Sequence, residues 1–291
     1  MRRLFVFFVM RSGPFRSRKN PPCQRREKLV YWSKRLQRAY HGKGGKHMEK
    51  FFSWLKGKAK QERPYCAAVV PAAGSARRME GVDKILAELG GVPVIVRTLG
   101  ALNDCELIDE IIVVTREDLI VPISGLVKQH GLNKVKTVVK GGDTRAESVR
   151  LGLAEVSKEA DLAAIHDGAR PFVTRELLEE VIHAAERTNA AAPAVPVVDT
   201  VKVAHNGLVD STPDRETLFA VQTPQVFEYG LITGALERAL RDKIPLTDDC
   251  SAVEAMGMKV TLTTGSRENI KITTPIDLAT GEAILQWLEQ D

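Results

Sequence analysis

Short apolar runs alternate with longer amphipathic segments from about residue 65 to the end of the chain. Each run has four or five mostly apolar residues, and the intervals leave room for helices: Cys66–Val70, Ile111–Thr115, Val135–Val139 and Ala163–His166. Runs of this kind predict strands buried on both faces of a parallel sheet, joined by helical crossovers. We therefore expect an α/β fold with a mostly parallel, doubly wound, Rossmann-like sheet.

Three threonines are placed to begin predicted helices: Thr144, Thr174 and Thr274. The first forms the spacing of a capping box with Glu147. The second precedes Glu176–Arg187, where apolar residues recur on one helical face. The third precedes Pro275, and proline is favoured at the first position of a helix, so we expect a last helix that ends near Gln290.

Residues 190–227 depart from this alternation. Apolar and polar residues alternate along Val195–Ala204, and Asn206-Gly207 is a strong signal for a two-residue hairpin turn. The polar stretch Asp210–Thr217 then leads to a second strand-like run, Leu218–Gln222. We interpret residues 196–225, approximately, as a β-arm that leaves the main sheet.

Charge divides the chain into two unlike parts. Residues 1–63 hold 19 of the 42 Lys and Arg but only three of the 37 Asp and Glu, a net charge of +16. The remainder holds 23 basic and 34 acidic residues, a net charge of −11. Because the body is acidic, the basic pI does not indicate nucleic acid as a partner. The apolar run Leu4–Met10 is too short to span a bilayer, so no membrane partner is expected either.

We treat residues 1–64 as a basic N-terminal extension and residues 65–291 as the main domain, which includes the β-arm. Three interpretations of the extension stay open: a true translation start at Met48, a disordered basic tail, or a targeting segment. Residues 1–47 lack apolar periodicity and are predicted to be dispensable. The four cysteines lie far apart with no C-x-x-C pair, which favours reduced thiols in the cytoplasm.

The first motif that carries chemistry directly follows the first predicted strand. Small residues fill this loop, where backbone N–H groups can approach phosphate closely: Ala72, Ala73, Gly74, Ser75 and Ala76. It is neither a Walker A loop nor a G-x-G-x-x-G fingerprint. Arg78 and Lys84 place two cations nearby, a combination suited to a triphosphate. The alternative is a tight turn followed by solvated charge.

Three further motifs follow along the chain. Gly141-Gly142-Asp143 precedes a helix that contains Ser148, and it fits either an anion or base site or a plain capped turn. The next motif is His166-Asp167-Gly168-Ala169-Arg170-Pro171. Asp167 can hold Mg²⁺ or a ligand hydroxyl, and Arg170 can bind an acceptor phosphate. His166 fits a structural role better than a catalytic one. The last, Asn269–Thr273, is predicted to be a strand with one outward lysine, Lys271.

Together the four motifs, in this order and spacing, resemble the 2-C-methyl-D-erythritol 4-phosphate cytidylyltransferase family over about residues 65–288. The resemblance implies transfer of CMP from CTP to 2-C-methyl-D-erythritol 4-phosphate, with release of pyrophosphate, in non-mevalonate isoprenoid biosynthesis. It also implies Mg²⁺ as the cofactor, and a homodimer whose β-arms reach between subunits.

The resemblance assigns roles to individual residues. Those that would act in catalysis are Arg78, Lys84, Arg215 and Lys271. CTP would be bound by Ala72, Ala73, Gly74, Ser75, Ala76, Gly142, Asp143, Ser148, Asp167 and Gly168. The acceptor would be surrounded by Asp167, Arg170, Thr200, Arg215 and Lys271. Asp167 would also be the metal ligand, and Thr247-Asp248-Asp249 matches a segment to which no sharp role is assigned.

Two positions depart from the family pattern. Ala76 stands where a second glycine is usual, and Asp83 stands before Lys84 where proline is common, so that a carboxylate lies beside a cation meant for phosphate. An active enzyme is still expected. One alternative is a cytidylyltransferase for another polyol phosphate, such as ribitol 5-phosphate. A non-catalytic nucleotide-binding protein would be expected to lack Arg78, Lys84 or Lys271, and all three are present.

Overall fold

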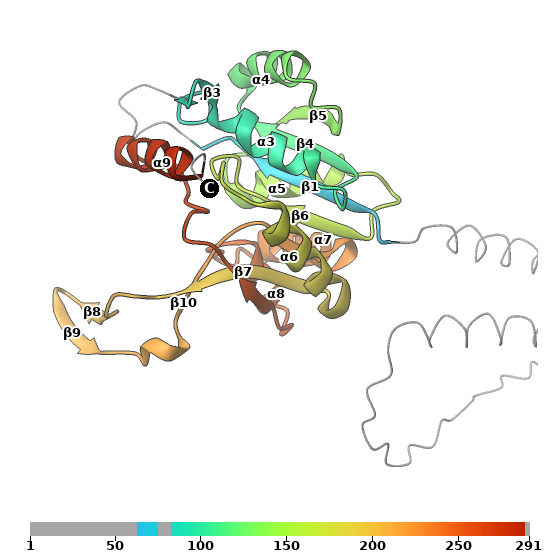
Figure 1. Cartoon of the computed structure of the whole chain (residues 1–291). Helices are drawn as coiled ribbons and strands as arrows, with labels where there is room; N and C mark the ends of the chain where they lie inside the picture. Colours follow the sequence, from blue (N-terminus) through green and yellow to red (C-terminus); the bar gives the residue numbers. More distant parts are fainter. Residues whose placement is uncertain (1–62, 75–82, 289–291) are drawn as a thin grey trace, which may run out of the picture. The chain divides into compact units, whose positions relative to one another are not determined.

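The computed structural model describes residues 63–74 and 83–288, all within one unit, Gln61–Asp291. An eight-stranded sheet forms its centre, in the order β10-β7-β11-β6-β1-β4-β5, with β12 paired to β7 (Figure 1). The strands are β1 (Cys66–Pro71), β4 (Glu110–Thr115), β5 (Val135–Lys140), β6 (Leu162–Ile165), β7 (Ala190–Pro196), β10 (Phe219–Val221), β11 (Gln225–Glu228) and β12 (Thr261–Thr264).

The four predicted strands lie side by side and run parallel, in the order β6-β1-β4-β5. Strand β11 runs antiparallel to both β6 and β7, and β10 is antiparallel to β7, so the sheet is mixed toward the arm. The prediction of a mostly parallel α/β sheet is confirmed.

Helices cover both faces of this sheet. They are α3 (Val94–Asp104), α4 (Glu117–Gln129), α5 (Arg145–Ala154), α6 (Arg175–Thr188), α7 (Tyr229–Arg241), α8 (Asp249–Glu254) and α9 (Pro275–Leu288). Cys66, Ala68 and Val70 of β1 join a core with α3, α4 and α6, whereas Ala67 and Val69 join a second core with α5, α7 and α8. Alternate residues of one fully buried strand therefore face two cores, as a doubly wound sheet requires.

The predicted helix starts are present. Thr144 and Glu147 form a reciprocal capping box at the start of α5, and the Thr174 hydroxyl accepts the Leu177 N–H at the start of α6. Helix α9 begins at Pro275 as expected. At this helix start the Asp277 carboxylate accepts a hydrogen bond from the Thr274 N–H, so a side chain of the first turn binds the backbone that precedes the helix.

The β-arm leaves the sheet between β7 and β10 (Figure 1). It carries a hairpin of β8 (Val203–His205) and β9 (Leu208–Ser211), followed by the short helix η1 (Arg215–Thr217). Asn206 and Gly207 join the strands with positive φ angles of 51° and 80°, which confirms the predicted turn. The expected continuous strand Val195–Ala204 is divided, because the chain leaves its sheet partners after Pro196.

The prediction of a strand over Asn269–Thr273 is wrong. These residues form an irregular segment whose backbone groups bond to separate partners instead of a ladder: the Ile272 N–H donates to Ala169 O, and Arg170 Nη1 donates to Asn269 O. The strand that this part of the chain adds to the sheet is β12, which pairs with β7 and which the sequence patterns did not indicate. A small hairpin, β2 (Glu88–Leu89) with β3 (Val92–Pro93), precedes α3.

No helix in residues 63–74 and 83–288 is both long and apolar enough to cross a membrane. Residues 1–62, and with them nearly all of the basic extension, lie outside the described residues, as do 75–82 and 289–291.

Candidate active site

A cleft of about 470 Å³ opens at the carboxyl ends of β1, β5 and β6, which is where open α/β sheets place their ligands. It is lined by Pro71, Ala72, Ala73, Gly74, Lys84, Ile85, Gly142, Asp143, Thr144, Arg145, Ser148, Asp167, Ala169 and Lys271. All four sequence motifs therefore contribute to one cavity.

The first loop is held tightly against the end of the sheet. The Ala72 N–H donates to Val114 O at 2.7 Å, and the buried Thr115 hydroxyl donates to Ala72 O at 3.1 Å. A Cβ on Gly168 would lie 3.2 Å from Ala72 Cβ, and a Cβ on Gly74 would lie 3.3 Å from Lys84 Nζ. Small residues are thus required by close packing, and Lys84 Nζ lies beside Gly74. Three predicted site residues fall outside the described residues: Ser75, Ala76 and Arg78.

The second loop packs directly on the start of α5. A Cβ on Gly141 would lie 2.6 Å from Ser148 Oγ, and one on Gly142 would lie 2.5 Å from Glu147 Cβ, so only glycine fits at either position. The Gly142 N–H donates to the buried Ser148 Oγ at 3.2 Å. Asp143 remains exposed at the rim. The helix N-terminus and the exposed backbone beside it can accept a polar or anionic ligand group.

Asp167 is the carboxylate at the centre of the cleft. Lys271 Nζ lies 2.7 Å from Asp167 Oδ2, Arg145 Nη2 lies 3.3 Å from Oδ1, and Arg170 Nε lies 3.8 Å from Oδ2. Burial would raise the pKa of Asp167, but attraction to Arg145, Lys271 and Arg170 outweighs it and lowers that pKa below its ordinary value. The cleft stays electropositive, because four cations (Lys84, Arg145, Arg170 and Lys271) outnumber the carboxylates of Asp143, Asp167 and Asp249, and this suits phosphate groups.

His166 has a structural position, as its sequence context favours. Its ring is fully buried, and Nε2 lies 3.2 Å from Arg170 O, a carbonyl that can only accept. The proton is therefore on Nε2, and Nδ1 accepts from the Thr223 hydroxyl at 3.1 Å. The same hydroxyl accepts the Asp167 N–H. Burial lowers the pKa of His166 to about 4, so the ring is neutral and serves to fix the Asp167–Arg170 loop.

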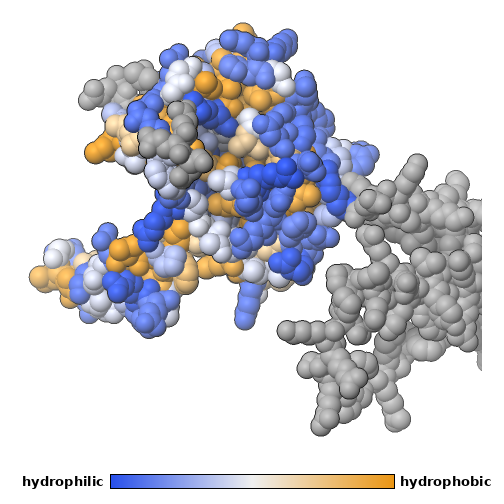
Figure 2. All heavy atoms as spheres, viewed as in Figure 1, coloured by the Kyte–Doolittle hydropathy of each residue, from blue (hydrophilic) through white to orange (hydrophobic). Residues whose placement is uncertain are grey.

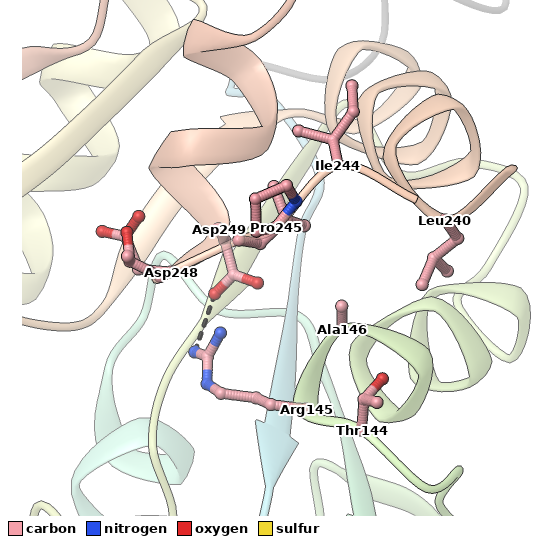
Figure 3. Close-up of a pocket in the computed structure, with 10 residues that line it drawn as sticks. Thr144, Arg145, Ala146, Leu240, Ile244, Pro245, Asp248 and Asp249 are labelled. Atoms are coloured by element: carbon pink, nitrogen blue, oxygen red, sulfur yellow. Dashed lines mark ion pairs between the residues drawn. The ribbon is translucent and has the colours of Figure 1, made fainter. Parts of the chain in front are cut away.

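Arg145 and Asp249 are site residues that the sequence motifs did not single out. Arg145 Nη2 lies 2.7 Å from Asp249 Oδ2 (Figure 3). The same guanidinium lies 3.3 Å from Asp167 Oδ1. Burial raises the pKa of Asp249 and attraction to Arg145 opposes that rise. The Gln225 side-chain oxygen accepts the N–H groups of Asp249 and Cys250, which fixes the start of α8.

A second pocket of about 280 Å³ lies against this ion pair, between the start of α5 and the segment that joins α7 to α8. The unassigned motif Thr247-Asp248-Asp249 forms part of its wall. The motif therefore has a structural position behind the cleft, and its match to a family segment was the sequence signal that pointed to Asp249.

Thr200 and Arg215 do not line the cleft of their own chain. Both are exposed on the arm, where Arg215 Nη1 donates to Val198 O at 3.1 Å. The structure thus groups the predicted residues into two sets, one around Asp167 and one on the arm.

A Mg²⁺ in this cleft would have to be carried mainly by the phosphate oxygens of a substrate, because the part of the chain that the structure describes surrounds Asp167 with cations and not with further metal ligands. The described residues hold no group of three His, Cys, Asp or Glu side chains that could bind a metal by themselves. Asp167 supplies one ionised carboxylate inside the cleft, and Mg²⁺ is commonly held by one or two carboxylates together with substrate phosphates.

Comparison with known proteins gives one consistent family. The family model for 2-C-methyl-D-erythritol 4-phosphate cytidylyltransferase (IspD) matches residues 66–287. The protein of that name from Syntrophus aciditrophicus is 44% identical over 227 residues, covering 77% of this chain and 97% of its own. The one from Desulforamulus reducens is 45% identical over 231 residues, covering 76% of this chain and 98% of its own.

Solved structures agree with these relatives. The crystal structure of 4-diphosphocytidyl-2C-methyl-D-erythritol synthase from Anaerococcus prevotii has a TM-score of 0.70 and 33% identity, covering 77% of this chain and 96% of its own. The 2-C-methyl-D-erythritol 4-phosphate cytidylyltransferase of Thermus thermophilus has a TM-score of 0.63 and 33% identity, covering 75% of this chain and 98% of its own.

Proposed function

The chain belongs to the 2-C-methyl-D-erythritol 4-phosphate cytidylyltransferase family, and we propose that the cleft around Asp167 is its active site. It is a nucleotidyltransferase that moves CMP from CTP to 2-C-methyl-D-erythritol 4-phosphate, releases pyrophosphate and serves isoprenoid biosynthesis. The family match favours this acceptor over ribitol 5-phosphate. The observation that carries the site assignment is the convergence of Lys271, Arg145 and Arg170 on one buried carboxylate.

The chemistry needs no side-chain nucleophile. An anionic oxygen of the acceptor phosphate attacks the α-phosphorus of CTP in line, and the bond from that phosphorus to the pyrophosphate oxygen breaks. The electron pair of the broken bond leaves with pyrophosphate, so no proton has to be removed before attack. Alignment and charge stabilisation then supply the catalysis.

Lys84 and Lys271 contribute positive charge to the cleft from two separate segments of the chain. Lys84 Nζ lies beside Gly74 of the first loop, where the triphosphate would be held by Ala72–Gly74 and by Ser75 and Ala76. Lys271 Nζ is held by Asp167 and is assigned to the α-phosphate and the acceptor. Arg78, outside the described residues, is assigned to the triphosphate with Lys84.

The remaining contacts divide between nucleoside and acceptor. Gly142, Asp143 and Ser148 at the start of α5 are assigned to the cytosine ring, and Gly168 to the ribose. Arg170 is assigned to the acceptor phosphate, since its side chain lies within 3.8 Å of Asp167 and is anchored on Asn269 O. Mg²⁺ bound to Asp167 and the phosphates would neutralise charge on the triphosphate.

The arm supports a homodimer. Large apolar side chains are exposed along it, including Leu208 at 74% and Val209 at 60%. Figure 2 shows hydrophobic residues among hydrophilic ones on this part of the surface. Such a surface is expected to be covered by a partner. In such a dimer, Thr200 and Arg215 of one subunit would reach the cleft of the other subunit. There Arg215 could bind the acceptor phosphate through its guanidinium.

Mixing two inactive variants tests the shared site. Arg215→Ala subunits and Lys84→Ala subunits are combined under conditions that allow exchange. If Arg215 acts on the partner's cleft, one site of each mixed dimer carries both defects and the other is intact, so part of the activity returns. Verified mixed dimers that stay inactive would exclude this placement.

The cytoplasm is the proposed site of action. The three described cysteines, Cys66, Cys105 and Cys250, are free and buried, which agrees with a reducing compartment.

Donor preference tests the assignment of the second loop. The backbone of Gly142 packs closely on the start of α5, and a base bound there would be read partly by backbone groups, which suits a pyrimidine, so CTP should be preferred strongly over ATP and GTP. Comparable turnover with a purine triphosphate would contradict the cytosine assignment.

A further inference from the structure

Asp83 directly precedes Lys84, yet its carboxylate bonds to other groups. Asp83 Oδ2 accepts a hydrogen bond from Arg116 Nη2 at 2.7 Å, and Oδ1 accepts the Ile85 N–H at 3.1 Å. The Asp83 side chain is 14% exposed and that of Arg116 is 33% exposed. The sequence alone placed this carboxylate beside a cation meant for phosphate; the fold gives it a different cationic partner.

The backbone of Asp83 fixes the turn that carries Lys84. Asp83 O accepts the N–H groups of Leu86 and Ala87, each at 2.9 Å. Beyond that turn the chain is tied to α3, because the Ile95 N–H donates to Ile85 O at 3.0 Å. Asp83 is therefore the residue at which the turn begins, and its side chain caps the turn through Ile85.

Arg116 connects this turn to the edge of the sheet. It directly follows Thr115, the last residue of β4, whose hydroxyl bonds to Ala72 O in the first loop. Its guanidinium is held from the other side by Asp118, with Arg116 Nε 3.1 Å from Oδ1 and Nη2 3.0 Å from Oδ2. Asp118 therefore orients the guanidinium that binds Asp83.

We propose that the Asp83–Arg116 ion pair positions Lys84 for the triphosphate. Arg116 anchors the turn to the same strand end that supports Ala72, so that Lys84 is held beside the first loop. It also occupies the carboxylate of Asp83, which would otherwise be available to pair with the neighbouring ammonium. Asp83 and Arg116 are positioning residues, since neither lines the cleft.

The inference rests on the proposed role of Lys84, and it makes an ordered prediction for variants. Arg116→Ala leaves a carboxylate without its cation next to Lys84 and should raise the KM for CTP about tenfold, equivalent to about 1.4 kcal/mol. The double variant Asp83→Asn/Arg116→Ala removes that carboxylate while Asn can still accept the Ile85 N–H. It should therefore bind CTP better than Arg116→Ala does, a non-additivity expected of residues in contact.

The readout is chosen to exclude a merely structural effect. The KM for the acceptor should stay unchanged in Arg116→Ala, and thermal unfolding should shift little, because a partly exposed ion pair contributes little to stability. Asp118→Asn is the matched control: it removes the charge of the exposed partner of Arg116 but keeps an amide oxygen that can accept from the guanidinium and orient it. It spares Asp83 and should leave the KM for CTP at the wild-type value.

Lys84→Ala in the same assay separates the two levels of the proposal. If Lys84→Ala is impaired but Arg116→Ala keeps the wild-type KM for CTP, the positioning role is refuted and the active site stands. A double variant no better than Arg116→Ala also refutes it. If Lys84→Ala itself is unimpaired, the assignment of Lys84 fails and the inference fails with it.

Discussion

Replacing Lys271 with alanine is expected to lower kcat by about 10²–10³ and to leave the protein folded. Lys271 Nζ lies 2.7 Å from Asp167 Oδ2, and its 37% exposed side chain faces the cleft. Negative charge moves onto the departing pyrophosphate in the transition state. Removing one preorganised cation from such a site corresponds to about 2.7–4 kcal/mol of activation free energy.

The cost in stability should be much smaller. Asp167 is 8% exposed, but Arg145 and Arg170 remain 3.3 and 3.8 Å from its carboxylate after Lys271 is removed. A partly exposed ion pair contributes up to about 1 kcal/mol, which corresponds to a Tm decrease of roughly 2–4 °C for a domain of this size. The loss in rate should therefore clearly exceed the loss in stability.

Lys136 provides a matched control. Lys136 Nζ lies 3.2 Å from Glu110 Oε2, and the two side chains are 48% and 7% exposed, so this is again a partly exposed lysine on a buried carboxylate. Lys136 is near the start of β5, at the end of the strand away from the cleft. Lys136→Ala should show a similar small decrease in Tm and an unchanged kcat.

The assay is steady-state pyrophosphate release at saturating CTP and acceptor, with thermal unfolding measured on the same preparations. A Lys271→Ala enzyme that keeps wild-type kcat would refute the assigned mechanism. Equal loss of activity in Lys136→Ala would show instead that any weakened ion pair impairs the enzyme.

Three further outcomes are expected. Because burial lowers the pKa of His166 to about 4, its contribution of about 3 kcal/mol to the free energy of unfolding is fully present above pH 6.5 and lost as the pH falls toward 4; equal pH slopes for wild type and His166→Gln would contradict this. Arg145→Met should reduce the free energy of unfolding in urea by about 3 kcal/mol, since Asp249 is 1% exposed and loses its cation, whereas a neutral effect would show that Asp249 is protonated. A chain that begins at Met48 should match the full chain in soluble yield and activity, and a large loss of either would give residues 1–47 a role.

Local patterns predicted most of what forms the cleft. The buried strands β1, β4, β5 and β6 follow from continuous apolar runs, and the α5 capping box follows from Thr144 and Glu147. Because parallel strands bring their carboxyl ends to one edge, the sequence alone predicts that the three loops that follow β1, β5 and β6 lie together.

The features that the sequence patterns did not predict share a physical cause, because each depends on tertiary partners. The Arg145–Asp249 pair joins residues that are far apart in the sequence, and no local pattern encodes it. Asn269–Thr273 has the apolar alternation of a strand, but side chains and single carbonyls satisfy its backbone. β12 is short and only partly buried, so its sequence, TLTT, gives a weak apolar signal.

Acceptor choice is the most direct test of the assigned reaction. Purified protein is given CTP and Mg²⁺ with 2-C-methyl-D-erythritol 4-phosphate, ribitol 5-phosphate or other polyol phosphates, while pyrophosphate release is followed and the nucleotide product is identified by mass. We predict CDP-methylerythritol as the product and a kcat/KM for methylerythritol phosphate on the order of 10²-fold or more above that for ribitol 5-phosphate. Equal or faster turnover of ribitol 5-phosphate, or no pyrophosphate release with methylerythritol phosphate, would contradict the assignment.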